Sequence, residues 1–351
     1  MVTKPARKSN ADLDQKIRTD VRGWKLQSIL TAGTNANQDA LLMASGGDPS
    51  RCLTALGSYV GGNGFTQPMS TSMYDTTNRL SVPKFPENAS PECLASTVAL
   101  PHTCGPCENF TREEMLEHEA KCLRHLHKIL IMAALEGRPY RVLLLEYILG
   151  GNGGELSGRF LIKLARLLKV FDVVVVADEI LTGGRVGPGM VMTTSMPEEF
   201  QERVEYITMG KFMHCALILK KIPTKPTHQD ELLRGTSTTQ DAGEAYSLWV
   251  SVSALLKKGA IKRRQKQVLQ KLKLTKHTDE VWGRGLLLFI SKSRMSLYKG
   301  LKNRVLPMLM TNIPVRALSC RPSKWNRSTV TEYLRSGAIE WMDAQVSTCS
   351  V

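Results

Sequence analysis

The sequence has no apolar run of the length that a membrane span needs, which excludes the integral membrane classes. A transmembrane helix takes about 20 predominantly apolar residues, whereas the apolar runs here, such as "VVVVA" (173–177), are much shorter. The first residues, "MVTKPARKSNADLDQK", contain no apolar core and so argue against a secretory signal. We therefore expect a soluble, cytoplasmic protein with no membrane partner, although an organellar location stays open.

Aromatic residues are few, at 6% of the chain, but the hydrophobic share of 42% lies near the globular norm and excludes disordered and fibrous classes. A length of 351 residues accommodates one large domain, or a large and a small one. The eight cysteines are scattered through a chain without a secretory signal, so reduced thiols are expected.

Positive charge is in excess, because 47 basic residues against 32 acidic ones give a net charge of +15. Much of this excess lies in "KKGAIKRRQKQVLQKLKLTKH" (257–277), which could bind a nucleic acid. No interleaved aromatic residues or known nucleic-acid-binding module accompany it. A solvated basic helix face is therefore the favoured interpretation, and a nucleic-acid partner is not expected.

Helix-like and strand-like segments alternate in the middle of the chain. Apolar residues recur at helical spacing over 116–137 and 158–169, and short apolar runs at 141–146 and 173–178 read as buried strands. Helices and strands of these lengths in alternation predict βαβ units. The expected fold class is therefore α/β, with a mainly parallel central sheet covered by helices.

Charged side chains stand where these strands end. Glu146 ends one strand and Asp178 ends the next, followed by Glu179. Ligands of open parallel sheets bind beyond the carboxyl ends of the strands, although Asp178 could also cap a turn or pair with a buried arginine. Upstream, Gly33 and Thr34 open a helix whose first N–H groups suit a phosphate, which is a weak signal by itself.

Seven segments extend this pattern along the chain. They are "TAGTNANQDALLMAS" (31–45), "LGSYVGG" (56–62), "LLLEYILGGNGG" (143–154), "VVADEILTGGRVG" (175–187), "YITMGKFM" (206–213), "GTSTT" (235–239) and "WGRGLLLFI" (282–290). In this order and at these spacings they resemble the motifs of class III pyridoxal-phosphate-dependent aminotransferases, the family of ornithine and acetylornithine aminotransferases. The resemblance covers residues 25 to about 320.

The resemblance implies a fold type I enzyme with pyridoxal 5'-phosphate as cofactor. Such an enzyme moves an amino group from an amine or amino-acid donor to a keto or aldehyde acceptor by a ping-pong Schiff-base mechanism. It further implies an N-terminal segment (1–24), a large cofactor-binding domain (25–262) and a small C-terminal α+β domain (263–351).

It also implies a role for each matched residue. Lys211 and Asp178 are the catalytic pair, in which Lys211 anchors the cofactor and Asp178 holds the proton of its pyridine nitrogen. The remaining assignments are Gly33 and Thr34 to the phosphate, Tyr59 to stacking on the ring, Glu146 and Glu179 to the pocket wall with Glu179 toward the substrate, Leu181 to the position facing the ring hydroxyl, Thr238 to the phosphate of a neighbouring subunit in a homodimer, and Arg316 to a substrate carboxylate.

Other interpretations stay open. An aminomutase would carry the same motifs, and the departures at Asn35, Val60 and Tyr147 also fit a catalytically impaired descendant acting as a dimeric binding or scaffold protein. Such a descendant could use a structural zinc site, because one group has the spacing C-x2-C-x10-H-x3-C. Its members are Cys104, Cys107, His118 and Cys122. The "CGPC" pair could also be a redox motif, but no strand leads into it.

Overall fold

The computed structural model describes residues 9–62, 64–67, 69, 97–102, 111–150, 153–222, 242–259, 263, 266, 281–285 and 287–290. Four residues with predicted roles lie outside these ranges, as does most of the proposed C-terminal domain. They are Cys104, Cys107, Thr238 and Arg316.

A seven-stranded sheet forms the centre of the molecule, in the order β1-β7-β6-β5-β4-β2-β3. Its members are β1 (Trp24–Leu30), β2 (Cys52–Ala55), β3 (Thr97–Val98), β4 (Val142–Glu146), β5 (Val174–Glu179), β6 (Val204–Met209) and β7 (Ala216–Lys221). Neighbours from β6 to β3 pair in parallel, whereas β7 is antiparallel to both β6 and β1. The mainly parallel sheet predicted from the alternating pattern is therefore confirmed.

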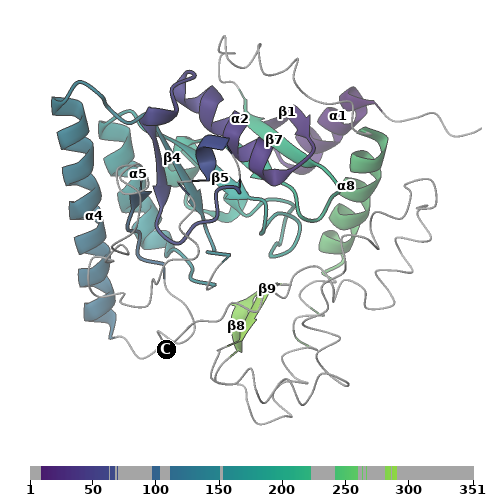
Figure 1. Ribbon diagram of the computed structural model, residues 1–351. Coiled ribbons are helices and arrows are strands. Elements are labelled where there is room, and N and C mark those ends of the chain that lie inside the picture. Colours follow the sequence, from purple (N-terminus) through teal and green to yellow (C-terminus); the bar gives the residue numbers. More distant parts are fainter. Residues whose placement is uncertain are drawn as a thin grey trace, which may run out of the picture.

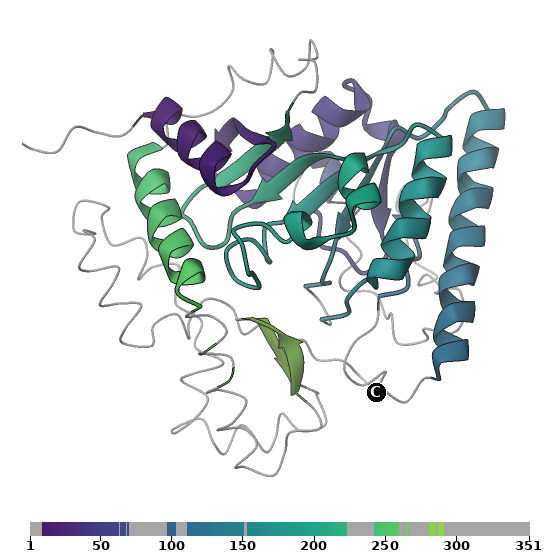
Figure 2. The same ribbon diagram turned by 180° about the vertical axis from the view of Figure 1, so that it is seen from behind.

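Helices cover both faces of this sheet, as the two views in Figures 1 and 2 show. They are α1 (Asn10–Asp20), α2 (Gly33–Ser45), α4 (Arg112–Leu135), α5 (Gly158–Val170), α6 (Glu198–Arg203) and α8 (Ala242–Lys257), with short 3-10 turns η1 (Pro49–Arg51), η2 (Gly64–Thr66) and η4 (Thr193–Ser195). None of the helices in these described ranges is both long enough and apolar enough to cross a bilayer.

The sheet has a hydrophobic core on each face, because successive residues of a strand point to opposite faces. In β4, Leu143 and Leu145 join the core that also contains residues of α1, α4, α5, α6 and α8. Val142 and Leu144 join the core under α2. The result is three layers, in which α2 stands on one face of the sheet and begins beside the carboxyl ends of the parallel strands.

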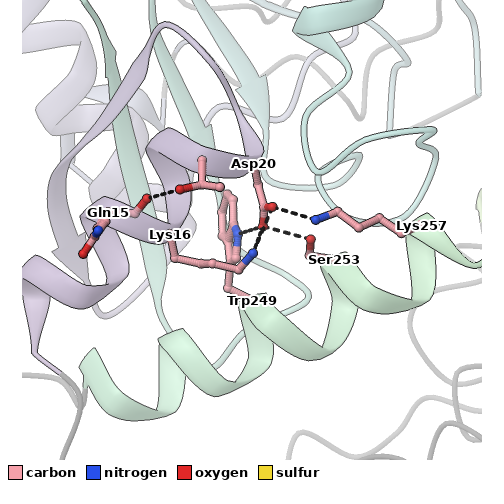
Figure 3. Close-up of polar contacts among 7 residues, drawn as sticks. Gln15, Lys16, Asp20, Trp249, Ser253 and Lys257 are labelled. Carbon is pink, nitrogen blue, oxygen red and sulfur yellow. Dashed lines mark hydrogen bonds and ion pairs between the residues drawn. The ribbon is translucent and has the colours of Figure 1, made fainter.

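One polar cluster ties the first helix to α8 (Figure 3). The Asp20 carboxylate accepts hydrogen bonds from Lys16 at 2.9 Å, Lys257 at 3.0 Å, Ser253 at 2.8 Å and the indole N–H of Trp249 at 3.0 Å. Its side chain is only 3% exposed. Burial raises the pKa of this carboxyl, but the four donors outweigh burial and lower the pKa to about 2. The proposed 1–24 segment thus contributes a packed helix to the same core as 25–262.

A two-stranded hairpin of β8 (Val281–Arg284) and β9 (Leu287–Ile290) lies apart from the large sheet. Its turn touches the loop that follows β5. A Cβ placed on Gly285 would lie 2.3 Å from the carbonyl oxygen of Arg185, so only glycine fits there. Beside it, Arg284 forms an ion pair with Glu155 at 3.0 Å.

Candidate active site

Three parallel strands deliver their ends to one edge of the sheet. Glu146 and Asp178 are register partners at the ends of β4 and β5. Lys211 follows the end of β6 by two residues, and its N–H donates to the carbonyl of Ile180 at 3.1 Å. The two carboxyls are buried, whereas Lys211 is exposed. An amine and two acids from distant parts of the sequence therefore lie beside one another.

A cavity of about 240 Å³ opens at this edge. The start of α2, the loop after β2, the end of β5 and the loop after β6 line it. Five residues with predicted roles are among its lining residues: Gly33, Thr34, Tyr59, Asp178 and Lys211. Its volume lies just below the range of about 300–1,000 Å³ that is typical of small-molecule sites.

The Asp178 carboxylate is held from two sides. Its Oδ1 accepts the backbone N–H of Ile180 at 2.9 Å, and its Oδ2 accepts the Asn37 side-chain amide at 2.7 Å. Asn37 is itself fixed, because its amide also donates to the carbonyl of Val60 at 2.9 Å and its Oδ1 accepts the Thr208 hydroxyl at 2.7 Å. A carboxylate has about four lone-pair sites, so Asp178 can still accept a ligand donor.

Asn37 carries no role in the sequence analysis, although it belongs to the "TNAN" segment. A signal was present, because Asn37 follows Gly33 by four residues and therefore lies on the same face of α2. The Asp178 partner is 141 residues away, and only the folded chain reveals that contact.

Burial pushes both strand-end acids toward their neutral forms. Burial is the largest cause that raises the pKa of Glu146 to about 8, and the charge of Asp178 adds to it. Burial likewise raises the pKa of Asp178 to about 6, against the hydrogen bonds of Ile180 and Asn37 and the charge of Lys211. Glu146 is positioned by the N–H groups of Tyr59 at 2.9 Å and Gly150 at 3.0 Å.

The first turn of α2 faces the cavity with its positive end. Its N-cap, Ala32, supplies no side-chain hydrogen bond to the first N–H groups, and Ala32, Gly33 and Thr34 all line the cavity. A Cβ on Gly33 would lie 2.9 Å from the Ile180 side chain, which packs beneath it. The helix dipole and several backbone donors therefore meet in a place that suits an anion.

Three residues predicted for the pocket, Glu146, Glu179 and Leu181, are not among the residues that line the cavity. Glu179 is 0% exposed, and its carboxylate accepts hydrogen bonds from the N–H groups of Met192 and Thr193 and from the Thr193 hydroxyl. Leu181 is buried in the core on the helix-rich face. Since adjacent residues of a strand point to opposite faces, Glu179 faces away from the cavity that Asp178 lines.

The residues after Lys211 are bulky and partly fill this end of the site. Phe212 is buried, and its ring centroid lies 6.4 Å from that of Trp249. Met213 and His214 line the cavity. His214 lies 3.4 Å from the Glu244 carboxylate of α8.

The second half of the predicted zinc group is present on α4, but the described residues contain no cluster of three or more metal-ligating side chains. The Cys122 sulfur lies 4.0 Å from Nε2 of His118. Burial raises the pKa of the Cys122 thiol to about 12, which disfavours the thiolate that zinc binds. Whether Cys104 and Cys107 complete the group stays a prediction, since both lie outside the described ranges.

Comparison with known proteins agrees with the topology. No protein-family model matches the chain, and no curated protein matches it. Solved structures do match, at low identity. The lysine aminotransferase from M. tuberculosis is 17% identical, with a TM-score of 0.54, over 81% of this chain and 67% of its own.

An omega-transferase from Vibrio fluvialis is 14% identical, with a TM-score of 0.57, over 86% of this chain and 76% of its own. A phospholyase from Arthrobacter, solved in complex with phosphoethanolamine, is 15% identical, with a TM-score of 0.57, over 82% and 67%. At these identities the likeness establishes the fold. The chain has the α/β fold of these structures, as predicted from the sequence.

Proposed function

We propose that the chain is a class III pyridoxal-phosphate-dependent aminotransferase that transfers an amino group from an amine or amino-acid donor to a keto or aldehyde acceptor. One observation carries the proposal: the Lys211 amine, the Asp178 carboxylate and the uncapped start of α2 surround a single cavity. These are the groups that the aldehyde, the ring nitrogen and the phosphate of that cofactor require.

When bound, pyridoxal phosphate supplies an aldehyde that exchanges amines and a ring that takes up electrons from the carbon next to the substrate nitrogen. Asp178 would accept the N–H of the protonated ring nitrogen, and the Asn37 amide and the Ile180 N–H would hold Asp178 in place. The first N–H groups of α2 and the Thr34 hydroxyl would bind the phosphate. Tyr59 would stack on the ring.

Lys211 would act twice. Its side-chain Nζ would hold the cofactor covalently while no substrate is bound. When free, the same Nζ would serve as the general base that moves the proton of the substrate carbon. The bulky residues Met213 and His214, where the family has small ones, narrow the cavity and would restrict which substrates fit.

We further propose a cytoplasmic homodimer. Tyr59 is 51% exposed and Lys211 is exposed, so a second subunit could cover the open side of the cavity. Thr238 for the phosphate and Arg316 for a substrate carboxylate stay predictions from the motifs. Glu179 is better assigned to anchoring the loop at Met192 and Thr193 than to substrate.

Absorbance spectroscopy tests the proposal. Protein mixed with pyridoxal phosphate and then desalted should keep a visible absorption band, which donor amines should bleach and pyruvate or 2-oxoglutarate restore. Lys211→Ala should lose the band. The matched control is Lys221→Ala, which removes a lysine from the far end of β7, where it bonds the Gln201 carbonyl. A band that persists in Lys211→Ala, or that the wild type never shows, would refute the proposal.

A further inference from the structure

The peptide groups on either side of Lys211 are both held by other parts of the chain. Its N–H donates to the carbonyl of Ile180 at 3.1 Å. Its own carbonyl oxygen accepts Nη2 of Arg185 at 2.5 Å. Both partners belong to the loop after β5, so the segment that ends in Asp178 also fixes the backbone of Lys211.

Arg185 reaches that carbonyl from the interior and is only 1% exposed. Arginine is rarely buried to this extent, because removing a guanidinium from water is costly. Its backbone is fixed by a hydrogen bond from its N–H to the Thr182 carbonyl at 3.0 Å, and the preceding Gly184 N–H donates to Met190 at 2.8 Å. A charged side chain is therefore kept in a rigid, buried place, where its guanidinium donates to the lysine's own backbone.

The hairpin of β8 and β9 closes over the same loop. Gly285 approaches the backbone of Arg185 and Val186 so closely that a Cβ would lie 2.3 Å from one and 2.6 Å from the other. The β8–β9 turn thus packs directly against the backbone of this loop.

We propose that Arg185 is a positioning residue that sets the direction in which the Lys211 side chain leaves its turn, and that the β8–β9 turn holds Arg185 in place through Gly285. This inference rests on the proposed function. A lysine side chain has four rotatable bonds and can adopt many conformations. The direction in which it leaves the backbone therefore decides how readily its Nζ reaches the aldehyde. A displacement of about 1 Å can slow a reaction on the order of a hundredfold.

The test separates binding from bond formation with two ligands. Pyridoxine phosphate has no aldehyde and reports binding alone. With pyridoxal phosphate, the Lys211 amine condenses with the aldehyde and releases one water, and borohydride then reduces the new C=N bond, leaving a label that peptide mass spectrometry locates. In Arg185→Met, pyridoxine phosphate should bind within about twofold of wild type, whereas labelling of Lys211 should slow by roughly tenfold or more. The labelling rate of Arg185→Lys, which keeps one donor, should lie between the rates of wild type and Arg185→Met.

Arg203→Met is the matched control, because Arg203 also donates to a backbone carbonyl, that of Val173, at 2.8 and 3.2 Å. That carbonyl lies at the opposite end of β5, so this variant should label as fast as wild type. Gly285→Ala should slow labelling in the same direction as Arg185→Met. Equal labelling rates in Arg185→Met and wild type would overturn the inference. So would a loss of pyridoxine phosphate binding as large as the loss of labelling rate, in both Arg185→Met and Arg185→Lys. A wild type that is not labelled at Lys211 would instead overturn the proposed function itself.

Discussion

Two aspartates of this protein have pKa values that are shifted in opposite directions. The side chain of Asp20 is 3% exposed although the residue as a whole is half-buried, whereas the whole of Asp178 is buried. The pKa of Asp20 is lowered to about 2, whereas that of Asp178 is raised to about 6. Burial raises the pKa in both cases, but Asp178 is the more deeply buried of the two, and the groups around the two carboxyls also differ.

The donors to the two carboxylates add to the difference in burial. Asp20 accepts two ammonium groups, a hydroxyl and an indole N–H, which together compensate its loss of water. Asp178 accepts hydrogen bonds from two neutral donors, the Asn37 amide and the Ile180 N–H, and its strand neighbour Glu146 is another acid. A carboxylate that accepts hydrogen bonds from charged side chains of the same chain, such as Asp20, stabilises the fold. A carboxylate that is buried with weaker compensation, such as Asp178, suits a cationic ligand.

Replacing Asp178 should have the largest effect on function. In Asp178→Asn, one acceptor becomes a donor and the partner of the ring nitrogen is lost, so transamination should fall by about 10²–10³. The control is Asp172→Asn at the opposite end of β5, where the side chain is 78% exposed and the positive φ of 53° suits asparagine. Steady-state rates of both variants check this, and activity within a few-fold of wild type in Asp178→Asn would be incompatible with the assigned role.

Replacing Asp20 should affect stability and spare the site. Asp20→Ala leaves the donors of Lys16, Lys257 and Trp249 without their acceptor and should lower the free energy of unfolding by about 2–3 kcal/mol. Lys257→Met should cost less than about 1 kcal/mol, because the Lys257 side chain is 68% exposed. Urea denaturation measures both. Labelling of Lys211 should be unchanged, and an equal loss in the two variants would argue against a cluster centred on Asp20.

Acid should remove the contribution of Asp20 to the free energy of unfolding over a defined pH range. A carboxyl with a lowered pKa stabilises the fold above its unfolded value of 3.8, and this stabilisation is lost as the pH falls toward 2. The difference in unfolding free energy between wild type and Asp20→Ala should therefore shrink between pH 4 and pH 2. A difference that stays constant through this window would contradict the lowered pKa.

The smallest expected effect comes from loosening Asp178 indirectly. Asn37→Leu removes the donor to Oδ2 and should weaken pyridoxal phosphate binding by roughly tenfold, equivalent to about 1.4 kcal/mol. Thr208→Val removes only the hydroxyl that orients Asn37 and should give a smaller loss of the same sign. Fluorescence titration of the cofactor measures both, and unchanged affinity in Asn37→Leu would remove Asn37 from the site.

Much of the fold was predictable, because β4, β5, α4 and α5 carry strong periodic patterns. The orientation of β7 was also accessible, since the six residues of 210–215 are too few for a parallel crossover. The weakly patterned β1 and the six-residue α6 offered no comparable signal. Their place is decided by packing on the rest of the sheet.

The matched motifs contain five residues that line the cavity, but motifs do not reveal the long-range contacts that hold those residues. Asp178 and Lys211 come from strand ends, which meet at one edge of any parallel sheet. Asn37 and Arg185 act through partners 141 and 26 residues away, and no local pattern encodes such pairs. The misplacement of Glu179 was avoidable, because neighbours in a strand cannot both face one cavity.

A crystal structure of the protein with pyridoxal phosphate tests the central claim most directly. The account predicts continuous density from Nζ of Lys211 to the cofactor, with an Asp178 oxygen within hydrogen-bond distance of the ring nitrogen and the phosphate at the start of α2. Cofactor density at another place, or a ring whose nitrogen points away from Asp178, would contradict it.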